Sequence, residues 1–244
     1  MSATGFAAEA GKEKALTVAR LALTAIALLW ETPSKALSGF NLSFDRSVNR
    51  RKTLTFVPGK FTLSGSSWSH MPHGPRVTSE DWKKQLTKKA LHFEVVGSIL
   101  EYFLSTDGKV ARPRMMNTLG QALLWFHEAC REPVTLMSIV KFSASLDALG
   151  GGGKASGIRR VINARLGIKD DDAALKDGTK LKEVIDEIYS DGRSRTIHGT
   201  NDKLGYDWSV TKSVAEHFAR YCLVTCIYWA GKHPSIDDPV QLSK

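Results

Sequence analysis

The stretch TSEDWKKQLTKKALHFEVVGSILEYFLS, residues 78–105, shows what kind of fold the sequence encodes. It opens with Thr78 and Ser79, residue types that cap helices, and acidic residues follow at once, as in many first helical turns. Apolar residues then recur at helical spacing. The same spacing continues in three later stretches, 113–131, 134–149 and 208–231. The sequence from residue 78 to residue 244 therefore predicts an all-α bundle.

Shorter helices are predicted at 154–166 and 178–191. Four glycines, 150–153, separate the first of these from the helix before it. The glycine run joins two helices and lacks the spacing of a phosphate-binding loop, so we interpret it as a flexible connection.

The first part of the chain has a different character. A helix is predicted from about residue 12 to residue 30, and a basic segment rich in Ser, Gly, Pro and strand-forming residues follows it. Within that segment, TLTFV and KFTLS flank Pro58–Gly59, a pattern typical of a β-hairpin. We therefore divide the chain into residues 1–77, a helix plus a basic β or irregular segment, and residues 78–244, the helical bundle.

The chain is basic, with 34 Lys and Arg against 25 Asp and Glu and a net charge of +9. This balance favours an anionic partner, nucleic acid before a membrane surface, although solvated lysine faces give the same excess. The apolar run at 15–30 is shorter than the roughly 20 residues that span a bilayer, and Arg20 interrupts it. We expect a cytoplasmic protein without a membrane partner, whose three cysteines are buried, reduced thiols.

No cofactor or metal site is expected. The sequence contains no phosphate-binding glycine motif and no His, Cys, Asp and Glu cluster with metal-ligand spacing. His70 and His73 lie in a Pro- and Gly-rich stretch, where histidines are more often solvated than bound to metal. His92, His127 and His217 occur singly in amphipathic stretches, which is typical of core-edge or surface positions.

The segment DGRSRTIHGT, residues 191–200, carries the residues with the clearest chemical potential. Arginine binds a phosphodiester through its planar fork, and histidine transfers protons near neutral pH. On a regular helix Arg193 and His198 lie roughly 140° apart, so one helix face does not present both. The alternative is structural: basic residues near a helix C-terminus compensate its dipole, and Gly199 ends the helix in a left-handed cap. The residues alone leave both interpretations open.

Arg193 and His198 form an R-x4-H pattern late in an all-α region, and two companion segments accompany it. SASLDALG (143–150) precedes EIYSDGRSRTIHG (187–199), in the order found in the Apea-like HEPN family, which the chain resembles over about residues 112–230. The resemblance implies a helical bundle that dimerises and brings two motifs together in one basic cleft. No family resembles residues 1–77.

The resemblance also implies a function for specific residues. Many HEPN proteins are metal-independent ribonucleases that act as toxins or antiviral effectors, some with a partner chain that inhibits them. By this analogy Arg193 would hold the scissile phosphate, and His198 would be the acid and base of a reaction that leaves a 2′,3′-cyclic phosphate. Ser194 matches the polar position after the arginine. Asp147 stands where the family usually has glutamate, and it reaches about one methylene less.

Further residues are candidates for contacts with RNA. Arg195, Arg159 and Arg160 could bind phosphates, and Tyr189 could stack on a base. Solvated charges and a core-edge tyrosine are the alternative interpretations. Whether the protein is an enzyme also stays open, because a non-catalytic RNA- or nucleotide-binding module and a dimerisation scaffold fit the same residues.

Overall fold

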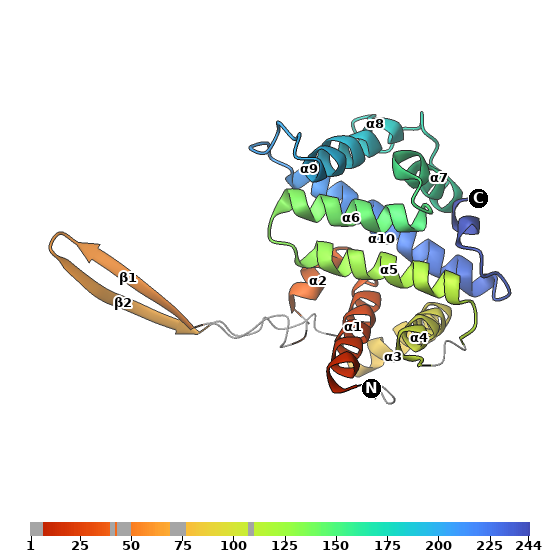
Figure 1. The fold of residues 1–244 in the computed structure, drawn as a ribbon, viewed down its shortest axis with the longest axis horizontal. Coiled ribbons are helices and arrows are strands. Elements are labelled where there is room, and N and C mark those ends of the chain that lie inside the picture. The colour runs from red at the N-terminus through yellow and green to blue at the C-terminus, as the bar shows by residue number, and fades with distance from the viewer. Residues whose placement is uncertain (1–6, 40–41, 43–49, 69–76, 107–109) are drawn as a thin grey trace.

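The computed structural model describes residues 7–39, 42, 50–68, 77–106 and 110–244. Most of these residues are helical, as the sequence predicts (Figure 1). The helices are α1 (Ala8–Ala27), α2 (Pro33–Gly39), α3 (Ser79–Lys88), α4 (Ala90–Leu104), α5 (Pro113–Arg131), α6 (Thr135–Leu149), α7 (Lys154–Leu166), α8 (Leu181–Asp186), α9 (Arg195–Ile197) and α10 (Ser209–Lys232). A π-helix, η1 (Glu187–Ser194), lies between α8 and α9, and a 3-10 helix, η2 (Pro239–Ser243), follows α10.

The predicted helices are largely confirmed, with one difference in the stretch that opens the bundle. Thr78 caps α3 by accepting a hydrogen bond of 3.1 Å from the Asp81 amide. The expected single helix over 78–105 is two helices, because Lys89 leaves helical geometry with φ −112° and ψ 21°. The break separates α3, which buries no residue, from α4, whose apolar face lies in the core.

The core lies among α5, α6 and α10, with α1 and α4 against it (Figure 1). Phe126 of α5 and Phe142 of α6 meet edge to face, with ring centroids 5.2 Å apart. Leu21, Ala25 and Leu28 from the α1 region belong to the same buried cluster. The first helix of the 1–77 segment thus shares its core with the helices that follow residue 78.

The predicted hairpin is present. Strands β1 (Arg50–Val57) and β2 (Lys60–Trp68) pair in antiparallel orientation on either side of Pro58–Gly59, and Val57 is opposite Lys60. Gly59 has a φ of +78°, a left-handed conformation that glycine adopts at little cost. Figure 1 shows the hairpin apart from the helical bundle.

Buried thiols and histidines complete the core. Cys222 and Cys226 are free and buried on α10, and burial raises the pKa of Cys226 to about 12. His92 and His127 are fully buried rather than at the core edge, because each satisfies a ring nitrogen internally: His92 Nε2 lies 3.2 Å from the Ala25 carbonyl, and His127 Nδ1 lies 2.9 Å from Thr24 Oγ1. Burial lowers the pKa of His92.

Two further findings, on membrane-spanning helices and on metal-binding clusters, hold for the parts of the chain that the structure describes. Within those ranges no helix is both long and apolar enough to traverse a bilayer. The same residues contain no group of three or more His, Cys, Asp and Glu side chains placed to hold a metal ion. His70 and His73 lie outside the described residues.

Candidate functional site

The R-x4-H segment begins on a π-helix. Helix η1 continues α8 from Glu187 to Ser194 with the wider i→i+5 turn, which is rare and occurs frequently at functional sites. Gly192 lets this turn approach α6 closely: a Cβ at residue 192 would lie 2.8 Å from Ile139 Cγ2. The π-helix therefore lies directly against the helix that carries Asp147.

Arg193 is held from two sides. One of its terminal nitrogens (NH1) is 3.1 Å from Asp147 Oδ2, and its guanidinium carbon lies 4.9 Å from the centre of the Tyr189 ring. The two charged side chains are only 22% and 14% exposed. Arg193 Nε is buried and has no hydrogen-bond partner in the described residues. The arginine is thus fixed in position and retains a buried donor that the described part of the chain does not use.

Asp147 also fixes the start of the next helix. Its second oxygen, Oδ1, accepts a hydrogen bond of 2.9 Å from the amide of Lys154, the first residue of α7. Lys154 has a φ of +58°, a left-handed conformation that is strained for a residue with a Cβ. The Asp147 carbonyl accepts a further bond of 2.8 Å from Gly152. One carboxylate therefore joins the end of the glycine run to Arg193, and the predicted flexibility of the run stays a prediction.

His198 and Gly199 end the motif helix in the predicted left-handed cap. Gly199 has a φ of +68° and donates to the Thr196 carbonyl at 3.3 Å, and Thr200 donates to the Arg195 carbonyl at 2.8 Å. This pair of bonds is a Schellman motif. The His198 side chain is exposed and forms no hydrogen bond or ion pair with any residue that the structure describes.

The charge of Arg195, by contrast, is paired. Its guanidinium lies 3.5 Å from carboxylate oxygens of both Asp191 and Asp202. Lys203 also binds Asp191 at 2.9 Å, and this hydrogen bond raises the pKa of Lys203. Ser194 is half-buried at the end of η1, where its carbonyl accepts a bond of 3.0 Å from the His198 amide.

The neighbouring arginines Arg159 and Arg160 of α7 differ from each other. Arg159 pairs with Asp170 at 3.1 Å and with Asp186 at 3.4 Å. Arg160 is exposed and has no ion pair among the residues placed by the structure. Tyr189, the predicted stacking residue, is half-buried against the core and presents a ring face to Arg193.

Several residues of this region were not found by sequence analysis. Asn201 donates 3.1 Å to the Asp191 carbonyl and 2.8 Å to Thr196 Oγ1, which ties the chain after the cap to η1 and α9. Ser143, one turn before Asp147 on α6, has a buried hydroxyl without a hydrogen-bond partner in the described ranges. No local pattern marks Asn201, because its role depends on contacts made by the folded chain.

Comparisons with known proteins add no further identification. No protein-family model matches the chain, and neither a curated protein nor a solved structure is significantly similar to it. The HEPN resemblance therefore remains a prediction from the motif segments.

Proposed function

We propose that the helical region around Asp147 and Arg193 is an HEPN-like domain that cleaves RNA without a metal ion. The observation that carries this proposal is the 3.1 Å ion pair between Arg193 and Asp147. It joins the two separate segments on which the HEPN resemblance rests. The location of Arg193 on a π-helix further supports a functional role.

The proposed reaction uses two side chains. Arg193 binds the scissile phosphate, and Asp147 and Tyr189 keep its guanidinium in one orientation. His198 takes the proton from the ribose 2′-OH, whose oxygen attacks phosphorus. The bond from phosphorus to the 5′-oxygen breaks, and that oxygen receives the proton from His198, which returns to its neutral form. The products are a 2′,3′-cyclic phosphate and a 5′-hydroxyl.

A homodimer would complete the site. No hydrogen bond joins the Arg193 and His198 side chains within the described residues, and in the proposed dimer a second copy would supply a second R-x4-H segment to the same site. Exposed apolar side chains within and shortly after the motif segment support such an interface, namely Ile197, Leu204, Tyr206 and Val210, which are 57–71% exposed. The same proposal includes a biological role: the protein would act in a toxin–antitoxin or antiphage system, and an inhibitory partner chain would bind over the motif segment.

Cleavage of an RNA pool in EDTA tests the reaction. Wild-type protein should cut RNA and leave cyclic-phosphate ends, and His198→Ala should lower the rate by about 100-fold or more. His217→Ala is the matched control, because His217 lies on α10, outside the motif segment, and its Nδ1 lies 2.7 Å from the Ser213 carbonyl oxygen. Equal cleavage by wild type and His198→Ala, with both folded by circular dichroism, would disprove the assignment of His198.

A second candidate is a non-catalytic RNA-binding or scaffolding module. It is favoured by the paired state of Arg193, Arg195 and Arg159, each of which contacts at least one carboxylate. This candidate predicts RNA binding that weakens steeply with salt and no strand scission by the wild type. If Arg193→Ala lowers the dimer population and leaves RNA affinity unchanged, the scaffold is favoured over the binding module.

A further inference from the structure

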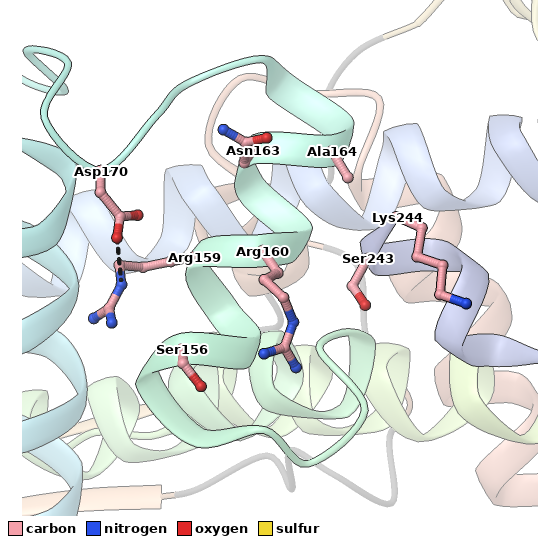
Figure 2. A pocket seen from close by; sticks show the side chains of 8 residues that line it. All are labelled: Ser156, Arg159, Arg160, Asn163, Ala164, Asp170, Ser243 and Lys244. Carbon is pink, nitrogen blue, oxygen red and sulfur yellow. Dashed lines mark ion pairs between the residues drawn. The ribbon is translucent and has the colours of Figure 1, made fainter.

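A hollow of about 490 Å³ lies between α7 and the C-terminal helix η2 (Figure 2). Ser156, Arg160 and Asn163 line it from α7, and Ser243 and Lys244 line it from the other side. Figure 2 shows the Arg160 side chain between Ser156 and Ser243. This side chain comes from the face of α7 that also carries Ser156, one turn earlier, so the helix presents a cation and a hydroxyl to the same space.

Arg160 contributes an unpaired cation. No carboxylate among the described residues is within ion-pair distance of it. Asp170 is the acidic residue that lines the hollow, and Arg159 already binds it at 3.1 Å. Arg160 and Lys244 therefore give the hollow an excess of positive charge.

The glycine loop and η2 fix the two walls. A Cβ at Gly153 would lie 2.8 Å from a terminal nitrogen of Arg160, so the absence of a side chain at Gly153 makes room for the guanidinium. On the opposite wall, Arg165 donates hydrogen bonds of 2.9 Å to the carbonyls of Leu242, Gln241 and Lys244. Because Arg165 holds this segment at three points, Ser243 and Lys244 keep their places relative to α7.

We infer that this hollow binds a phosphate group, supplied either by the backbone of an RNA strand or by a free nucleotide. The guanidinium of Arg160 and the ammonium of Lys244 can donate hydrogen bonds to phosphate oxygens, whereas the Ser156 and Ser243 hydroxyls already donate to the carbonyls of Gly153 and Val240. The volume lies in the range of small-ligand sites. No aromatic residue is among the residues that line the hollow, so it has no surface on which a base would stack. The inference does not depend on cleavage by Arg193 and His198.

The first test measures affinity for a labelled single-stranded 2′-O-methyl RNA, which internal attack cannot cleave, at several salt concentrations. Arg160→Ala should weaken binding about tenfold and make the salt slope shallower by about one. Lys244→Ala should act in the same direction. Lys84→Ala on α3 removes the same charge from a side chain that is 68% exposed and remote from α7, and it should leave affinity near that of the wild type.

The second test titrates AMP and inorganic phosphate into the same proteins by calorimetry. A free-nucleotide site gives saturable AMP binding that Arg160→Ala removes, with RNA affinity unchanged. A backbone site gives the RNA effect without saturable AMP binding. If the Arg160→Ala and Lys84→Ala proteins have the same affinity for RNA and the same affinity for AMP, and both have the melting temperature of the wild type, the hollow does not bind phosphate. Because neither titration measures strand scission, their failure and the failure of the proposed ribonuclease are distinguishable.

Discussion

Two pairs of arginines can be compared, Arg193 and Arg195 of the motif segment and Arg159 and Arg160 of α7, and their contacts differ. Arg193 and Arg195 both contact carboxylates, and Arg193 is mostly buried between α6 and Tyr189. On α7, Arg159 is paired, and Arg160 forms no ion pair with a residue that the structure describes. A paired, half-buried arginine is fixed in position, whereas an unpaired, exposed one contributes electrostatic attraction without a fixed geometry. The sequence shows the arginines, and only the folded chain shows which kind each one is.

The largest expected effect comes from removing the carboxylate that holds Arg193. Asp147→Ala leaves a half-buried cation unpaired and removes the acceptor of the Lys154 amide, so it should lower the free energy of unfolding by about 3 kcal/mol. Urea denaturation measures this loss. Asp170→Ala breaks a pair in which the carboxylate is 52% exposed, and it should cost less than about 1 kcal/mol.

Asp147→Asn separates the two contacts of this residue. The asparagine carbonyl can still accept from the Lys154 amide, but it does not neutralise Arg193. We expect Asp147→Asn to lower the free energy of unfolding by less than Asp147→Ala and by more than Asp170→Ala. If Asp147→Ala unfolded at the same urea concentration as Asp170→Ala, the Arg193–Asp147 pair would stabilise the fold no more than the exposed Arg159–Asp170 pair does.

A smaller effect is expected from closing the space between η1 and α6. Gly192→Ala places a methyl group 2.8 Å from Ile139 Cγ2 and should lower stability by about 2 kcal/mol. Gly97→Ala on α4 has nothing within 4 Å of its added methyl group and should instead raise stability by up to about 1 kcal/mol, because alanine favours the helix. A double-mutant cycle with Ile139→Ala should show a favourable coupling between residues 139 and 192. Additive effects would argue against their contact.

Local signals explain which parts of the fold were predictable. Pro113 begins α5, Pro58–Gly59 forms the hairpin turn, and Gly199 ends α9, because each of these residues has a conformational preference that acts without tertiary contacts. The break at Lys89 carries no such signal. It follows from the core, which accepts α4 and leaves α3 at the surface.

The candidate site was predictable only in part, for the same reason. Arg193 and Asp147 were both predicted from the motif resemblance, whereas the pairing of Arg159 with Asp170 and Asp186 depends on a loop and a helix that the sequence does not place. The π-helix was also missed, since a regular helical period does not distinguish its wider turn. The expected 140° separation of Arg193 and His198 therefore does not apply to a segment that changes from π to α geometry between them.

The smallest expected effect compares the neighbouring arginines of α7 directly. Arg159→Ala breaks two ion pairs with exposed carboxylates and should lower the free energy of unfolding by about 0.5–1 kcal/mol. Arg160→Ala breaks no ion pair with a described residue and should change it by less than about 0.5 kcal/mol. Urea denaturation at low and high salt checks both, because screening should reduce the loss for Arg159→Ala and leave Arg160→Ala unchanged. A clear loss of stability in Arg160→Ala would mean that this arginine supports the fold, and a phosphate-binding role would then no longer explain its position.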